Sequence, residues 1–191
     1  MYDIDATLTD FLLKWNDGDE QAMNDAVSAA YTELHRIAEV HFRESRPGKT
    51  FQPTALVHEA YIRLLSSRMQ FGNRNQFFWF MGKLMRHILT DHLRAKLTAK
   101  RGSGKVVNES QLGVSLPEIS GSLSAQQFLD LDLALQRLAG FDRRQSQILE
   151  MYYLCNLKID DIAENLKIST STVKRDLKMA KAWLANQMSV A

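Results

Sequence analysis

The chain has 191 residues, of which 45% are hydrophobic and 24% are charged, a composition typical of a soluble globular protein. No stretch reaches the roughly 18 apolar residues of a membrane span, and the acidic, polar start differs from a secretory signal, so we expect no membrane insertion. The single cysteine, Cys155, excludes an internal disulfide framework and fits the reducing cytoplasm. It lies in an apolar run, which predicts a buried structural thiol.

Charge divides the chain into three parts. Residues 1–45 carry three basic and ten acidic side chains, a net charge of −7, whereas residues 46–105 carry twelve basic and two acidic side chains, a net charge of +10. Residues 106–191 are nearly neutral, with a net charge of −1. An acidic front and a basic middle indicate different partners for different surfaces, with a polyanion opposite the middle. Basic side chains that merely solvate helix faces are the alternative explanation.

The apolar periodicity predicts helices along most of the chain and no convincing strand. In the first half, helices are predicted over residues 8–15, 20–44, 54–65 and 77–99. They are separated by a polar break at 16–19, a Pro-Gly stop at 46–48 and a polar loop at 66–76. In the second half, helices are predicted over residues 128–138, 143–154, 160–166 and 170–188. Asp142 is the expected N-cap of the second of these, and Ser169 or Thr170 of the last.

A change in composition separates the two groups of helices. Residues 102–124 are rich in glycine and serine, which predicts a flexible linker. This linker divides the chain into a helical domain over residues 1–101 and a second one over residues 125–191. The sequence therefore predicts an all-α fold of two small helical domains joined by a flexible linker.

Residues 159–177 have the form of a helix-turn-helix. The positions expected to lock two short helices together are Ile162, Leu166, Ile168, Val173 and Leu177. Ala163 is small where the helices would cross, and Ser169 offers a cap oxygen to the second helix. The exposed start of that helix carries side chains that can hydrogen-bond phosphates or base edges, namely Thr170, Ser171, Thr172, Lys174 and Arg175. Residues 167–181 have a net charge of +4, so positive charge is concentrated where DNA is expected to lie.

A second candidate surface is the helix predicted over residues 77–99. Four aromatic residues, 77–80, open it, and a basic stretch follows in which only Asp91 is acidic between residues 82 and 105. Basic groups can track a phosphate backbone and exposed rings can stack on unpaired bases, which favours a protein that captures a melted strand. The alternative is that the rings are core, and we expect this of at least two of the four. The amide-rich loop before the helix could read an extruded base or be a plain solvated connection.

Taken alone, the helix-turn-helix is compatible with a repressor, a response-regulator output domain, a sigma factor or a helical bundle with a chance match. The order of three sequence blocks favours one family. Residues 52–64, QPTALVHEAYIRL, closely resemble a signature of one subgroup of extracytoplasmic-function (ECF) RNA polymerase sigma factors. Residues 80–94 resemble the family's promoter-melting segment in region 2, and the helix-turn-helix with residues 175–184 resembles region 4. The resemblance covers nearly the whole chain.

The resemblance implies a role for each block. The helix with His58, Glu59, Ile62 and Arg63 would dock on the clamp helices of the polymerase's largest subunit. Contacts to the −10 promoter element and its unpaired strand would come from Asn73, Arg74, Asn75, Gln76, Lys83, Arg86, His87 and Arg94. Contacts to the −35 element would come from Thr170, Ser171, Thr172, Lys174, Arg175 and Lys178. The linker would run toward the active-site and RNA-exit channels of the polymerase.

The implied partners are core RNA polymerase, including the flap of its second subunit, and promoter DNA, with an anti-sigma factor as a further candidate. The implied location is the bacterial cytoplasm, at the nucleoid. Three positions depart from the family's pattern: His87 stands where many relatives carry Asn, Asp176 where many carry Arg, and Ser171 where Gly is frequent. Base preferences of relatives therefore do not transfer to this chain.

No residue pattern predicts catalysis, a metal site or a cofactor. His58-Glu59 lacks the second histidine of a zinc-protease helix. His87 and His92 are five residues apart, about 140° around a helix, which suits a shared metal poorly. The sequence therefore predicts a non-enzymatic transcription initiation factor. Two alternatives remain: a helix-turn-helix regulator that never binds polymerase, and a sigma-like protein that acts only by sequestering a partner.

Overall fold

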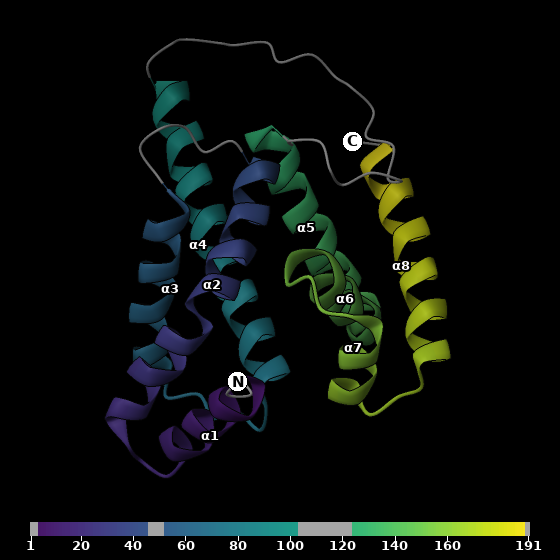
Figure 1. The fold of residues 1–191 in the computed structure, drawn as a ribbon. Helices are drawn as coiled ribbons and strands as arrows, with labels where there is room; N and C mark the ends of the chain where they lie inside the picture. Colours follow the sequence, from purple (N-terminus) through teal and green to yellow (C-terminus); the bar gives the residue numbers. More distant parts are fainter. Residues whose placement is uncertain (1–3, 46–51, 103–123, 190–191) are drawn as a thin grey trace.

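The computed structural model describes residues 4–45, 52–102 and 124–189, and all secondary structure within these ranges is helical (Figure 1). The elements are α1 (Ile4–Asn16), α2 (Glu20–Ser45), α3 (Pro53–Ser67), α4 (Arg74–Gly102), α5 (Ala125–Phe141), α6 (Arg143–Leu149), η1 (Glu150–Leu154), α7 (Ile159–Leu166) and α8 (Thr170–Ser189). The predicted all-α fold is confirmed. Among these helices, none is long and apolar enough to cross a lipid bilayer.

Helices α1 to α4 form a bundle in which each helix buries one apolar face. The predicted break between α1 and α2 is confirmed, and Gly18 adopts a positive φ of 96° there, which favours glycine. The loop between α3 and α4 is held by side chains of α1. The Asn16 amide donates to the Phe71 carbonyl at 2.9 Å and accepts from the Phe71 N–H at 3.0 Å, and Trp15 Nε1 donates to the Met69 carbonyl.

Helix α4 begins three residues earlier than the sequence predicts. The Asn73 side chain accepts a hydrogen bond from the Gln76 N–H at 2.9 Å, as an N-cap does. The polar residues that were expected to extend the loop therefore form the first turn of the helix. The predicted stop at residues 46–48 lies outside the described residues.

Helices α5 to α8 form the second group. Ser124 and Gln127 make a capping box at the start of α5, and Asp142 caps α6 through the Gln145 N–H, as predicted. The helix predicted over residues 143–154 is interrupted, because α6 ends at Leu149 and a π-helical turn follows. Such turns widen a helix locally and frequently occur at functional sites.

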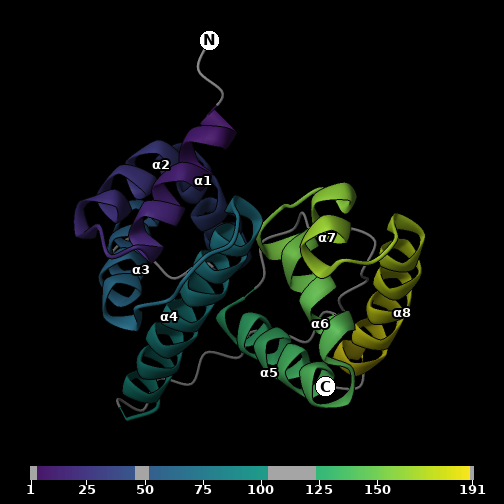
Figure 2. The ribbon, with the colours of Figure 1, turned by 90° about the horizontal axis from the view of Figure 1, so that it is seen from below.

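The two groups of helices pack against each other (Figures 1 and 2). Helix α4 contacts α5, η1 and α7, and α2 contacts α5 and η1. Buried residues from both groups belong to one continuous hydrophobic cluster, and a smaller cluster joins Leu89 and Leu93 of α4 to Phe128 and Leu129 of α5. The division into domains over residues 1–101 and 125–191 stays a prediction, and most of the predicted linker lies outside the described residues.

Candidate nucleic-acid interface

The helix-turn-helix is built as its sequence predicts. Ile162, Val173 and Leu177 are buried, Leu166 and Ile168 are half-buried, and the small Ala163 is 6% exposed. Lys167 takes a left-handed conformation with φ 54° in the turn. Of the two expected caps it is Ser169 that acts, because its Oγ accepts the Thr172 N–H at 3.1 Å.

The start of α8 presents a polar, cationic surface. Ser171, Lys174, Arg175 and Lys178 are exposed, whereas Thr170 and Thr172 are half-buried. The Thr172 hydroxyl lies 2.9 Å from Ser169 Oγ, so it takes part in the cap as well as facing outward. These charged side chains stand at the start of a helix that follows a tight turn. In a helix-turn-helix, this is where the recognition helix presents its side chains to the major groove.

Asp176 lies buried beneath this surface. Its carboxylate is 2% exposed and accepts from Arg144 Nε of α6 at 2.8 Å and from the neighbouring Arg175 Nε at 3.3 Å. A buried carboxylate bonded to two guanidinium groups ties α6 to α8 and orients one cation of the exposed row. The departure from the family's pattern at this position therefore has a structural role.

Replacing Asp176 with alanine should lower the free energy of unfolding by about 2 kcal/mol, because hydrogen bonds to charged groups contribute about 1.5–3 kcal/mol and Arg144 loses its partner. Urea denaturation followed by circular dichroism measures this loss. The variant Asp160→Ala is the control, since that aspartate is exposed. Equal stability of the two variants would show that the Arg144 pair contributes nothing.

Helix α4 carries the other predicted DNA contacts, and the structure separates them. Lys83, His87 and Arg94 are exposed, but Arg86 is only 3% exposed and faces the second group of helices. Arg86 Nη2 lies 3.0 Å from Glu150 Oε1 of η1, and its Nε lies 3.6 Å from Asp132 Oδ1 of α5. Arg86 therefore cannot reach DNA in this arrangement, whereas its predicted contact with the −10 element needs an exposed side chain.

The Arg86 contacts belong to a chain of alternating charges. Arg94 Nη2 lies 3.4 Å from Asp132 Oδ2, which also accepts from the Gln136 side chain at 2.8 Å. On the other side, Trp79 Nε1 donates to Glu150 Oε2 at 3.3 Å. Two cations and two carboxylates thus alternate across the contact between the helix groups. Arg86, Asp132 and Glu150 are buried there, whereas Arg94 is half exposed at the edge.

The predicted −10 contacts in residues 73–76 are mostly engaged in local structure. Asn73 and Gln76 cap the start of α4, and the Gln76 side chain also accepts from the Gly72 N–H at 2.8 Å. The Arg74 guanidinium lies 5.6 Å from the centre of the Phe78 ring. Asn75 is 5% exposed, so this amide is not presented to a base in the described arrangement.

The aromatic residues at the start of α4 are mainly core, as expected for at least two of the four. Phe77 and Phe78 are buried and pack edge to face at 5.6 Å between ring centres. Trp79 and Phe80 are half-buried. Lys83 Nζ lies 5.7 Å from the Trp79 ring centre, so this ring is engaged by a cation and by Glu150.

Helix α3 presents the predicted polymerase-docking residues on one outer face. Ile62 is 63% exposed, and His58 and Arg63 are exposed beside it. Glu59 pairs with Arg63 at 2.8 Å, one turn apart. Helix α3 packs on α2 and α4, on the side of the molecule away from α8 (Figure 2).

A family model described as ECF sigma factor matches residues 5–190. The chain belongs to this family. It is thus an RNA polymerase sigma factor of transcription initiation, which the sequence blocks implied. The subgroup suggested by residues 52–64 stays a prediction. No curated protein matches the sigma factor in sequence.

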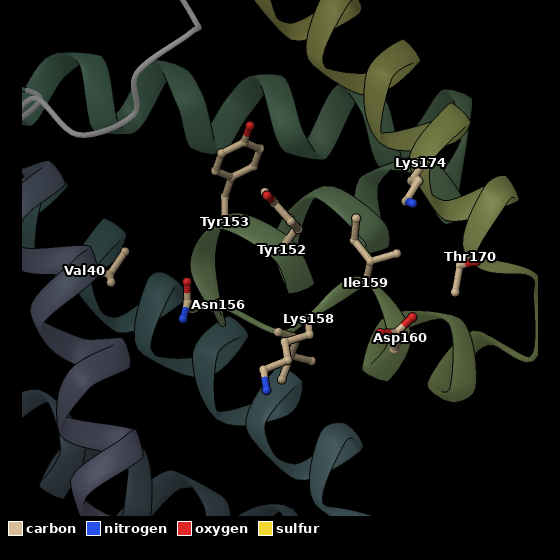
Figure 3. Close-up of a pocket in the computed structure, with 10 residues that line it drawn as sticks. Val40, Tyr152, Tyr153, Asn156, Lys158, Ile159, Asp160, Thr170 and Lys174 are labelled. Atoms are coloured by element: carbon tan, nitrogen blue, oxygen red, sulfur yellow. The ribbon is translucent and has the colours of Figure 1, made fainter.

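A groove of about 690 Å³ lies in the second helix group of this sigma factor, where η1, α7 and the start of α8 line it together with Val40 of α2. Figure 3 shows Thr170 and Lys174 of α8 on one side of the groove and Val40 of α2 on the other, with the η1 tyrosines between them. Lys181 Nζ lies 4.9 Å from the centre of the Tyr153 ring, which fixes that ring by a cation–π contact. Two predicted −35 contacts, Thr170 and Lys174, therefore line this groove.

Two buried titratable groups lie beside Arg86. Burial and the positive charge of Arg86 lower the pKa of His41 to about 3, so its imidazole is neutral near pH 7. Burial raises the pKa of the Cys155 thiol, which keeps it protonated and unreactive, as expected for a structural thiol. Burial and Arg86 also lower the pKa of His87.

In the described part of the chain, His, Cys, Asp and Glu form no group of three that could hold a metal ion.

Sequence reasoning did not single out Asp132 and Glu150. A signal for Asp132 was present, because it shares the apolar face of its helix with Phe128, Leu129 and Leu135, at spacings of three and four residues. Glu150 likewise stands between the buried Leu149 and Met151. A carboxylate on an apolar face predicts a buried ion pair, although only the fold identifies the partner.

Proposed function

We propose that this sigma factor directs promoter-specific transcription initiation by binding core polymerase and reading a −10 and a −35 element. The supporting observation is the placement of two distinct surfaces. A cationic recognition-helix start lies on α8, and a polar face with one exposed apolar side chain, Ile62, lies on α3, away from it. A protein that must hold an enzyme and DNA at once needs two such surfaces.

In this proposal, His58, Glu59, Ile62 and Arg63 dock on the clamp helices of the largest subunit. The exposed Ile62 supports this role, since an apolar side chain at the centre of a contact gains most from desolvation. The C-terminal helices contact the flap of the second subunit. An anti-sigma factor is a candidate competitor for these surfaces.

The −35 element is read in the major groove by the start of α8, with the contacts Thr170, Ser171, Thr172, Lys174, Arg175 and Lys178. The −10 element and its melted strand are held by α4 and its first turn, with the contacts Asn73, Arg74, Asn75, Gln76, Lys83, Arg86, His87 and Arg94. The work is binding energy applied to strand separation, so the chain is not an enzyme and needs no cofactor. It acts in the bacterial cytoplasm, at the nucleoid.

Transcription by purified core polymerase from total genomic DNA, with and without the protein, tests the proposal. We expect new transcript starts that share a two-part upstream motif when their 5′ ends are sequenced. Polymerase binding without new starts would favour a sequestering sigma-like protein. DNA binding without polymerase binding would favour a free-standing regulator.

Two variants should separate the two surfaces. Lys174→Ala with Arg175→Ala should lower transcription from −35-dependent promoters about ten-fold or more, because removing a phosphate or base interaction costs about 1 kcal/mol or more, while core binding is retained. Ile62→Glu should weaken core binding about ten-fold by placing a charge in an apolar contact.

Fluorescence anisotropy with labelled core polymerase measures the affinity, and run-off assays measure the transcription. Leu13→Glu is the control for Ile62→Glu, because Leu13 is 46% exposed and lies on α1. Loss of core binding in the Lys174 and Arg175 variant would contradict the division between the two surfaces.

A further inference from the structure

Asp176 is a carboxylate on the apolar face of the recognition helix. Val173, Leu177 and Ala180 share that face of α8, at spacings of one, three and four residues from Asp176, and all three are buried. The Asp176 side chain is itself only 2% exposed, so a DNA strand on this helix cannot touch it. A buried carboxylate is tolerated when cations pair with it. Any effect of Asp176 on DNA recognition must therefore pass through the groups that it binds.

Two arginines from different helices bind this one carboxylate. Arg144 of α6 donates from Nε to Oδ2 at 2.8 Å, and Arg175 of α8 donates from Nε to Oδ1 at 3.3 Å. Each oxygen thus takes one arginine. The two arginines remain open to solvent, with 49% and 65% of their side chains exposed. Two cations and one anion leave a net charge of +1 at this place on the surface.

The bonds to Asp176 decide which edge of each guanidinium is left for other acceptors. A guanidinium has N–H donors in one plane, one on Nε and the others on the two Nη groups. Nε of both arginines is bonded to the carboxylate, and neither guanidinium makes a further hydrogen bond with the described residues. The edge formed by the two Nη groups can bind two acceptors at once, as in a phosphate or in O6 and N7 of guanine. Asp176 therefore presents two oriented forks of donors.

The positions of the two arginines favour different parts of a DNA duplex. The major groove is about 12 Å wide and admits one α-helix, so side chains that reach base edges come from the recognition helix itself. Arg175 is exposed on α8, as are Ser171, Lys174 and Lys178. Arg144 comes from α6, which packs beside α8 (Figure 2). A helix beside the recognition helix faces the rim of the groove, where the phosphate backbone runs.

We propose that Asp176 is a positioning residue of −35 recognition. It directs the Arg175 fork onto a guanine of the −35 element and the Arg144 fork onto a phosphate at the rim of the groove. Arg144 is thereby a DNA contact that the sequence did not predict. This inference rests on the proposed function, and it adds the base that Arg175 reads, the residue that orients Arg175 and a backbone contact from a second helix.

The pairing acts by removing side-chain freedom before DNA binds. An unpaired arginine samples many rotamers and binds phosphates and base edges alike, whereas an arginine held at Nε has already lost much of that freedom. The bond to Asp176 therefore favours one direction of approach to the duplex. Specificity is a difference between affinities. Loss of this bond should therefore lower the preference of Arg175 for guanine more than it lowers overall binding.

Transcription from a promoter library tests the role of Asp176. The library carries a randomised −35 element upstream of one −10 region, and holoenzymes made with each variant are compared by sequencing their transcripts. We expect the wild type to prefer guanine at one base pair by about ten-fold or more, and Arg175→Ala to lose that preference. Asp176→Asn should lower the same preference about five-fold, because one carboxylate oxygen becomes an NH2 group that cannot accept from an arginine. Asp130→Asn is the matched control, since Asp130 bonds Gln126 of its own helix, α5.

Arg144 should act on all sequences alike. Arg144→Ala should lower transcription from every library member by about three-fold and leave the base preference unchanged. For the free protein on a short mixed-sequence duplex, this variant should reduce the slope of log affinity against log salt by about one. Arg144→Lys should restore both, because a lysine still pairs with a phosphate. Arg175→Lys should leave the guanine preference weakened, because lysine lacks the planar fork.

Three outcomes overturn the inference, once urea denaturation has established that each variant is folded in the assay. In the first, Asp176→Asn lowers transcription from all library members equally and keeps the wild-type base preference, so the carboxylate acts on stability alone. In the second, Asp176→Asn changes the preference at a base pair that Arg175→Ala leaves unchanged. In the third, Arg144→Ala keeps the wild-type transcription and salt dependence.

Failure of the proposed function has a different signature. A wild-type holoenzyme that transcribes the library without any −35 preference would reject −35 reading, and the role of Asp176 would fall with it. The salt dependence of the free protein would still decide whether Arg144 contacts DNA. A wild-type guanine preference that persists in Asp176→Asn would instead keep the proposed function and reject the inference.

Discussion

Arg86→Ala should expose Cys155 to thiol reagents and yet lower promoter-directed transcription at least ten-fold. The two effects have separate causes. Without the guanidinium, Asp132 and Glu150 lose the cation that compensates their burial, and removal of one partner from a buried ion pair costs about 3–5 kcal/mol. The helix groups should separate, because separation returns both carboxylates to water.

The loss of transcription should follow because Arg86 is no longer present to contact DNA once the two helix groups have separated. Run-off transcription at saturating core polymerase measures it, and thiol labelling of Cys155 measures opening in the same preparation. Lys83→Ala is the matched control: it removes an exposed cation of α4 that makes no contact with Asp132 or Glu150, so transcription should fall while Cys155 stays protected. Protection of Cys155 in Arg86→Ala would show that the carboxylates do not depend on Arg86.

Acidification from pH 7.5 to pH 5 should lower the free energy of unfolding by about 2 kcal/mol through His41. Its pKa is lowered to about 3 in the folded protein, against an ordinary value of 6.5. The unfolded chain therefore binds a proton below pH 6.5 that the folded chain does not. The stability contributed by neutral His41 is complete above pH 6.5 and is lost progressively as the pH falls toward 3, at about 1.4 kcal/mol per pH unit.

His41 of α2 lies between the two helix groups. The charged group that faces it is Arg86 of α4, which is itself paired with Asp132 of α5 and Glu150 of η1, and the Phe128 ring of α5 packs edge to face at 6.5 Å. A protonated imidazole there would meet a second positive charge in a dry site. Acid should therefore weaken the packing between the two helix groups as well as the fold of each group.

Urea denaturation at both pH values, followed by circular dichroism, measures the effect. The variant His41→Leu keeps an apolar group in the site and cannot take up the proton. It should lose about 2 kcal/mol less than the wild type between pH 7.5 and pH 5. An identical loss in the two proteins would assign the acid sensitivity to other groups.

Local pattern was sufficient for the helix-turn-helix and for most helix positions. Apolar spacing at three and four residues identified the buried positions Ile162, Val173 and Leu177, and cap chemistry identified Asp142 and Ser169. The same logic missed the cap at Asn73, because an amide in a polar stretch reads equally as loop or as helix start.

What the sequence alone determined about this protein is its all-α class, its helix-turn-helix, its uneven charge and its resemblance to a sigma factor family. These features depend on neighbours along the chain or on motifs read in order. Only the tertiary structure decided that Arg86 is buried, that Asp132 and Glu150 are its partners, and that Gly82 receives Cys155. Such pairs are separated by tens of residues, and their distances depend on how two helix groups dock. That docking decides whether a charged side chain is buried, and the apolar periodicity along one helix gives no information about the docking.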